Sequence, residues 1–477
     1  MSATDTDHGD DHLGDADREP TGVELPAAAP DPGADHGPGA DHDGAPVEAG
    51  PHREPHDPVR PNPLRLLAVV AAVVALGVFV SWEAVIVVLA LVFMIFMHEL
   101  GHYLTARRAG MLVTEFFIGF GPRVWSFRKG EVEYGLKAIP AGAYVRVVGM
   151  SNLDEVDPAD EARTYRQQPF WQRLSVAVAG STMHFLMALV LLFVVYAGFG
   201  APNPEAWTVD RVTPSEGLVQ NGEPVTSPSE AAGLEPGDRI IAIDDTEIGR
   251  FSDLREVVED NPGETVVLTV RRDGRTFETS TTLLSQGPEG AEEGFLGISG
   301  DVPRDRLGPL AAAGRAGTDF VEITGQSVTS LGRFFSPSGI SGFFDQAMNA
   351  QDDPAPEAGS GSEPTEDEQN RIVSIYGAAR IGTQATEAGM ATFLVFFALI
   401  NIFIGVFNLV PLLPLDGGHV AIAIYEKVRE WQLGLHRRYF ADIQKLLPVT
   451  YGVVAVLVSI GVLALYLDIA NPINLSN

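Results

Sequence analysis

VLALVFMIFMHELGHYLTA (residues 88–106) is a long apolar stretch that ends in a His-Glu-x-x-His motif. On a helix, His98 and His102 lie one turn apart on the same face, where both imidazoles can bind one metal ion. Glu99 follows the first histidine and can take a proton from a water at that metal. Because such polar groups are costly in hydrocarbon, their place in a run of membrane-spanning length indicates a functional site rather than a chance match.

The chain is acidic and apolar at once. Its 477 residues carry a net charge of -31, yet 45% of them are hydrophobic, so acidic and apolar residues must occupy different segments. There is no basic tract of the kind that nucleic-acid binding requires, and we exclude a nucleic-acid partner. Cysteine is absent, which excludes disulfides and thiolate ligands, so a metal must be bound by His and carboxylates.

Residues 1–60 are predicted to be a disordered acidic tail. They contain fifteen Asp or Glu against three Arg and few large apolar side chains, so they cannot bury enough surface to fold. The segment is not a signal peptide, because the apolar region begins only near Leu64. Weak zinc capture is the alternative to a solvated tail, since six histidines lie here: His8, His12, His36, His42, His52 and His56.

Apolar runs predict an α-helical polytopic membrane protein with four core spans and an extra N-terminal span. A single span needs about 20 residues, so the apolar region 64–106 predicts two helices joined by a tight turn, with one long tilted helix as the alternative. The extra transmembrane helix is expected at 64–81 and the first core span at 84–106. The other core spans are expected at 174–198, 391–410 and 449–467.

Basic residues predict the orientation of these spans in the cell membrane. The loop 107–173 contains ten Lys or Arg, and the loop 426–447 is also basic. By the positive-inside rule both loops are cytoplasmic, which places the His-Glu-x-x-His motif near the cytoplasmic face. The segment 205–286, which follows the second core span, then lies outside.

Two segments between the spans have the pattern of strands. The sequence of residues 131–150 predicts a β-hairpin. This hairpin is apolar enough to enter the bilayer at places where protein or a cavity shields its backbone. Residues 205–286 predict a soluble β-rich domain, because short alternating runs such as RIIAI and TVVLTVRR are separated by Gly-Asp and Asp-Gly turns. Residues 287–376 are expected to form a linker with an acidic disordered loop at 351–370.

A catalytic zinc usually has three protein ligands, so the two histidines need a third. Asp416 is the leading candidate, and His419 is the alternative. Pro411 and Pro414 break the helix before Asp416, and Gly417 lets backbone approach closely. A broken helix at membrane depth is tolerated where it lines a cavity.

These motifs carry a family resemblance. HELGH, GFGP at 119–122, YGLKAIPAGAYV and NLVPLLPLDGGH together resemble the site-2 protease family of intramembrane zinc metalloproteases, over about 90–200 and 377–477. The resemblance implies a protease core, expected at 84–200 and 377–477, that hydrolyses a peptide bond within a transmembrane helix.

The resemblance also implies roles for individual residues. Zinc would be held by His98, His102 and Asp416, with Glu99 as general base. The segment 131–150 would be the membrane-associated β-loop that pairs with the substrate strand.

Three further residues are substrate-binding candidates. Asn408 matches the family's Asn ahead of Asp-Gly, and Gly142 lies in the β-loop. His184 stands where the family often has Asn, and Ser181 stands for Pro. His184 could donate a hydrogen bond, approach the zinc or simply be packed. The extra N-terminal span is a second departure from the family core.

The segment 205–286 resembles a bacterial PDZ domain, through AAGLEPGDRIIAIDD at 231–245. It would bind a peptide strand or act as a size filter that excludes intact ectodomains. By the resemblance, the substrate is a single-span membrane protein such as an anti-sigma factor, first trimmed by an upstream site-1-type protease, or a signal-peptide remnant. The alternatives from other classes are a membrane-anchored PDZ scaffold with an inactive or structural metal site, and a metal transporter.

Overall fold

The computed structural model describes residues 62–150, 154–216, 218–220, 223–286, 293–349, 373–434 and 438–470. The predicted acidic tail at 1–60 and the predicted acidic loop at 351–370 lie outside these residues.

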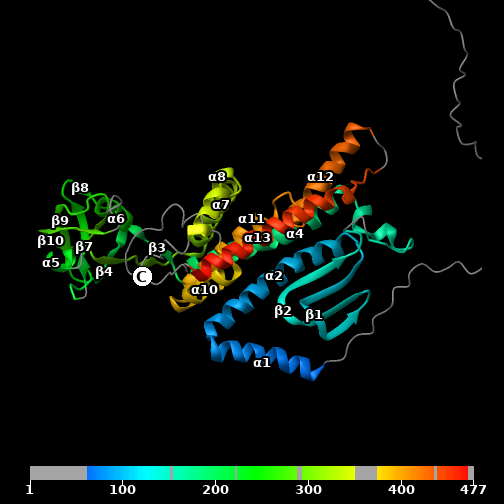
Figure 1. Ribbon diagram of the computed structural model, residues 1–477, viewed down its shortest axis with the longest axis horizontal. Helices are drawn as coiled ribbons and strands as arrows, with labels where there is room; N and C mark the ends of the chain where they lie inside the picture. Colours follow the sequence, from blue (N-terminus) through cyan, green and yellow to red (C-terminus); the bar gives the residue numbers. More distant parts are fainter. Residues whose placement is uncertain are drawn as a thin grey trace, which may run out of the picture. The chain divides into compact units, whose positions relative to one another are not determined.

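The first apolar region forms two helices, as predicted: α1 (Pro63–Phe79) and α2 (Trp82–Arg108) (Figure 1). The break is set by Ser81, whose Oγ accepts a hydrogen bond from the Ala84 amide at 3.0 Å and so caps α2. Trp82 packs over Gly77, where a Cβ would lie 2.9 Å from the indole ring. At 17 residues α1 is shorter than a usual span, so its crossing of the membrane stays a prediction.

Four helical segments in the described part of the chain are long and apolar enough to cross a membrane. They are Trp82–Arg108, Ala179–Gly198, Met390–Asn408 and Gln444–Ala470. The second begins later than predicted, because a separate helix, α3 (Phe170–Ala177), precedes it. The first of these four segments is α2, and the other three correspond to α4 (Ala179–Gly198), α11 (Met390–Asn408) and α13 (Leu447–Ala470).

Small residues allow α4 and α11 to pack closely with α7 (Pro309–Phe334). Ala188, Ala312, Ala316 and Ala398 are all fully buried in this cluster. α7 lies inside the segment predicted to be a linker, so much of that segment is helical. The same holds for α8 (Pro337–Asn349) and for α10 (Ile375–Glu387), which begins at the linker's end.

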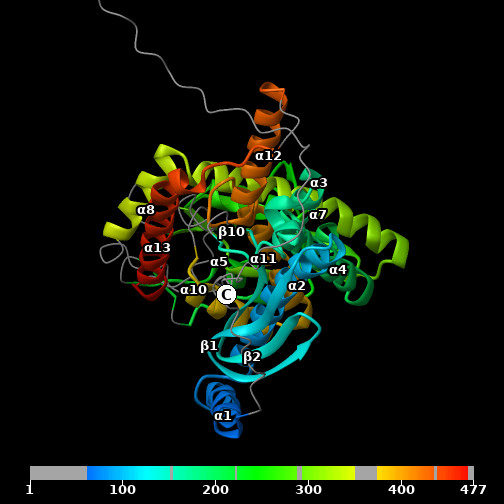
Figure 2. The ribbon, with the colours of Figure 1, turned by 90° about the vertical axis from the view of Figure 1, so that its right-hand side faces the viewer.

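The predicted hairpin at 131–150 is one half of a larger sheet, and the prediction is corrected accordingly. β1 (Val113–Lys129) pairs with β2 (Val132–Val147), and both strands bend. Phe116 consequently lies opposite both Val145 and Tyr134. The sheet lies beside α2, with α1 next to it (Figures 1 and 2). The aromatic and β-branched residues that suggested one hairpin continue upstream on β1.

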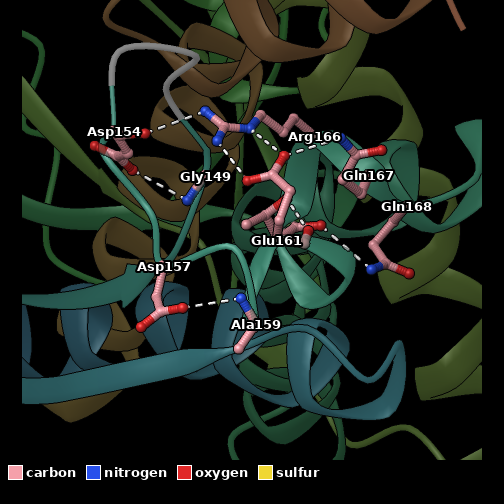
Figure 3. A network of polar contacts seen from close by, with 9 residues as sticks. Gly149, Asp154, Asp157, Ala159, Glu161, Arg166, Gln167 and Gln168 are labelled. Carbon is pink, nitrogen blue, oxygen red and sulfur yellow. Dashed lines mark hydrogen bonds and ion pairs between the residues drawn. The ribbon is translucent and has the colours of Figure 1, made fainter. Parts of the chain in front are cut away.

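A polar network holds the connection between β2 and α3 (Figure 3). Arg166 donates two hydrogen bonds to Glu161, at 2.9 and 2.6 Å, and these bonds hold the pKa of Glu161 below its usual value. The Gly149 amide donates to Asp154 at 3.0 Å. The same connection contains two short 3-10 helices, η1 (Glu161–Arg163) and η2 (Tyr165–Gln167).

The β-rich segment folds around its own hydrophobic core, which includes Trp207, Ile240, Leu268 and Leu296. Its main sheet has the strand order β10-β9-β7-β8, formed by β7 (Arg239–Ile243), β8 (Thr246–Glu247), β9 (Thr265–Arg272) and β10 (Arg275–Thr282). The helices are α5 (Pro228–Ala231) and α6 (Phe251–Glu259).

This unit extends past its predicted end at 286. β13 (Ile298–Asp301) pairs with β4 (Thr208–Val212), so the chain returns to the start of the unit before leaving it. The remaining short elements are β3 (Ala201–Pro202), η3 (Pro204–Ala206), β5 (Val219–Gln220), β6 (Glu223–Pro224), β11 (Leu284–Gln286), β12 (Glu293–Phe295) and β14 (Arg304–Asp305).

After α11 the chain breaks and restarts as α12 (Asp416–Gln432), a helix that occupies part of the predicted loop 426–447. Pro411 and Pro414 lie in the break, as the sequence predicts. Glu426 of α12 forms a buried ion pair with Arg173 of α3. A short helix, η4 (Ile443–Leu446), leads into α13.

Candidate metal centre

Helix α2 and the first residue of α12 bring three ligand side chains together. The Nε2 atoms of His98 and His102 are 3.1 Å apart. The Asp416 Oδ2 atom lies 3.4 Å from the first of these nitrogens and 3.2 Å from the second. One ligand atom from each residue lies within 4.8 Å of the others, which is the arrangement that a single metal ion requires. The three predicted ligands therefore meet, although Asp416 is distant in sequence.

The hydrogen bonds around this cluster fit a cation. His102 Nδ1 lies 2.8 Å from the Val176 carbonyl oxygen, which can only accept, so Nδ1 carries the proton. In the neutral ring Nε2 then holds a lone pair, directed at Asp416. Among the described residues, no hydrogen-bond donor satisfies the buried Oδ2 of Asp416. A metal ion would satisfy this oxygen together with the imidazole nitrogens, and two His with one carboxylate suit zinc.

Space for the imidazoles depends on Gly180 of α4. A Cβ on this residue would lie 2.2 Å from Cε1 of His98 and 2.6 Å from Nε2 of His102. Such contacts are too short for any side chain, so only glycine fits against the two rings. Gly180 was not predicted as a site residue, because nothing in the local sequence pattern connects it with the histidines of α2.

Glu99 lies beside the ligands and is held by the sheet. Its Oε2 accepts a hydrogen bond from the main-chain amide of Val145 in β2 at 3.0 Å. Glu99 directly follows His98 on α2, and its carboxylate interacts electrostatically with His102 and Asp416.

His184 and Asn401 form a buried polar pair next to the histidines. The His184 and His98 rings have centroids 5.0 Å apart. Asn401 Nδ2 donates to the Phe397 carbonyl at 2.7 Å, so its Oδ1 faces His184 Nδ1 at 3.0 Å and accepts from it. Asn401, which is fully buried, was missed from the sequence because it looks like an isolated polar residue in an apolar span.

Three other residues predicted from the sequence, Gly142, Asn408 and His419, do not belong to the group of ligands. Gly142 lies in β2, and a Cβ on it would be 2.9 Å from the Phe120 ring. Asn408 is the last residue of α11. His419 is outside the ligand group, and its ring centroid is 6.4 Å from that of Tyr165. Of the two candidates for third ligand, the geometry therefore favours Asp416.

Comparison with known proteins agrees with this chemistry. A model of peptidase family M50 matches residues 86–441. The chain is 32% identical over 418 residues to the zinc metalloprotease Rip1 of Mycolicibacterium smegmatis, with 82% of this chain and 98% of that protein covered. It is 31% identical over 413 residues to Rip1 of Mycobacterium tuberculosis, with the same coverage.

Proposed function

The chain belongs to peptidase family M50, the site-2 proteases, and on that premise we propose that His98, His102 and Asp416 hold its zinc while Glu99 acts as general base. The protein is an intramembrane zinc metalloprotease that acts on a membrane protein. The observation that carries the residue assignment is the convergence of two imidazole nitrogens on a buried carboxylate oxygen that has no hydrogen-bond donor among the described residues.

Each residue of the centre has a defined task in this proposal. Zinc, when bound, activates a water and polarises the scissile carbonyl. Glu99 takes the proton of the attacking water and passes it to the leaving amine. The Val176 carbonyl fixes the tautomer and orientation of His102, and Gly180 leaves room for both rings.

The bent sheet is the proposed substrate platform. A peptide bond in a helix is protected by its hydrogen bonds, so the substrate must unwind before it is cut. An edge strand can pair with the unwound segment, and residues 143–147 lie on the side of the sheet that reaches Glu99. Gly142 directly precedes this segment, and we assign it, His184 and Asn408 to substrate contact.

We propose a single-span membrane protein as substrate, such as an anti-sigma factor already trimmed by a site-1-type protease. The basic loops 107–173 and 426–447 support a cytoplasmic position for the nearby active site. The β-rich unit, which we propose to be a PDZ-like domain, is then extracytoplasmic. There it either binds a peptide strand or excludes substrates with intact ectodomains.

The test uses purified full-length protein, zinc and a model single-span substrate in detergent or liposomes. Glu99→Gln should keep the zinc content of the wild type and lose cleavage by at least about 100-fold, because it keeps the shape and removes the base. Glu83→Gln, in the first turn of the same helix, is the control and should cleave normally. A wild type that binds zinc but cuts nothing would favour a membrane-anchored scaffold instead.

A further inference from the structure

Glu99 is the one residue of the proposed catalytic set whose side chain is held by the sheet. Its Oε2 atom accepts a hydrogen bond at 3.0 Å from the main-chain amide of Val145. A hydrogen bond to a carboxylate is charge-assisted and is about twice as strong as a neutral one. The base is therefore fixed by a backbone group, whose position depends on the whole strand.

The register of the sheet shows why this amide is available. Val145 lies opposite Phe116, which belongs to the neighbouring part of β1. On its other side the amide reaches Glu99 of α2. Alternate residues of a strand direct their amides toward the same edge, so Ala143 and Val145 present theirs to one side. This edge is the one that we propose for the substrate strand, which would pair with the outward backbone groups of residues 143–147 other than the Val145 amide, already bonded to Glu99.

The same two elements also lie close together one helical turn earlier. Ile95 lies one helical turn before Glu99 on α2. A Cβ built on Gly142 would come within 3.9 Å of the Ile95 Cγ2. Helix α2 thus lies close to β2 at two successive turns, with Ile95 beside Gly142 and with Glu99 hydrogen-bonded to Val145.

We propose that the main-chain amide of Val145 positions the general base, so that the sheet edge and the Glu99 carboxylate move as one body. A substrate strand that pairs with residues 143–147 is then aligned with the base by the same segment of backbone. Without the amide, the carboxylate gains rotational freedom, and a displacement of about 1 Å at a reacting group can cost 100-fold in rate. This inference rests on the proposed function of Glu99.

The experiment removes this one donor and keeps the side chain of Glu99. Val145→Pro lacks the amide hydrogen, whereas Val145→Ala keeps it and is the reference with which the proline variant is compared. Cleavage of the model substrate, kcat and KM separately, and zinc content are measured on the full-length protein. We expect Val145→Pro to lose about 10- to 100-fold in kcat relative to Val145→Ala, with little change in KM or zinc content.

Two additional variants make the result decisive. Replacing Val145 by its α-hydroxy acid, which puts an ester in place of the amide, removes the donor without the ring of proline and should lower kcat similarly. In the Glu99→Gln background, Val145→Pro should cause no further loss, because groups that act as a unit are not additive. A purely structural role would instead lower the residual activity again.

Clear outcomes would overturn the inference. Equal kcat for the ester variant and Val145→Ala would show that the amide does not position the base, whatever the proline variant does. A further fall in the Glu99→Gln background would do the same. An inactive wild type would refute the proposed function instead, so the two failures are distinguishable.

Discussion

At the scale of single residues, the metal centre depends on backbone groups and missing side chains as much as on its ligands. His102 is oriented by the Val176 carbonyl, which determines that its Nε2 atom faces Asp416. Gly180 has no side chain, and this leaves the space that the rings of His98 and His102 occupy. The ligands can therefore be lost by changes in residues that never touch zinc.

Gly180→Ala is expected to abolish zinc binding and cleavage. Its Cβ would lie 2.2 Å from His98 and 2.6 Å from His102, so the rings must move away from Asp416. Metal content by mass spectrometry or emission analysis measures the loss. Gly198→Ala is the control, because this glycine of the same helix has nothing within 4 Å of the added Cβ. Normal zinc content in Gly180→Ala would contradict the prediction.

Local spacing was enough to predict part of this centre. His98, Glu99 and His102 follow one another on a single helix, so their common location needs only helical geometry. Asp416 was predicted from its setting between helix-breaking and flexible residues. The pair between His184 and Asn401 could not be predicted, because its two members come from helices whose contact is a property of tertiary packing.

At the scale of elements, α12 determines where Asp416 lies. Asp416 is the first residue of this helix, so a shift of the helix would carry the ligand with it. Glu426, farther along α12, forms a buried ion pair with Arg173 of α3 and also accepts from the Ala441 amide at 2.7 Å. The guanidinium lies over the Tyr165 ring, 5.5 Å from its centroid. These contacts join α12 to the helix that precedes α4.

Arg173→Met is expected to destabilise the protein strongly. It leaves the Glu426 carboxylate buried without its cation, and breaking a buried pair in this way costs about 3–5 kcal/mol. Thermal unfolding in detergent should show a clear fall in Tm. The double variant Arg173→Met with Glu426→Met should recover most of that stability, because no charge stays buried. A double variant no more stable than the single one would refute this account.

The strands were harder to predict than the helices. The four apolar spans follow from length and hydropathy, and the break at Ser81 follows from a capping residue between two apolar runs. Only the second half of the bent sheet was recognised, because β1 and β2 change direction and pair in more than one register. Such pairing depends on contacts between distant residues, which the local pattern does not contain.

At the scale of the whole molecule, the metal site joins two parts of the protease core that are far apart in sequence. His98 and His102 come from the first core span, and Asp416 comes after the third. The zinc ligated by all three would connect α2 to α12 directly. Folding of the core and occupation of the site are then thermodynamically linked, since a ligand that binds only the folded state stabilises it.

Removal of zinc is therefore expected to lower the Tm of the full-length protein. At a free zinc concentration 100 times Kd the linkage amounts to about 2.7 kcal/mol, and a chelator should remove it. Glu99→Gln keeps all three ligands and should show the same zinc-dependent shift in Tm as the wild type. Asp416→Ala breaks the connection between α2 and α12, so zinc should change its Tm much less. If zinc stabilised Asp416→Ala as much as the wild type, the ion would be held elsewhere, and Asp416 would not be its ligand.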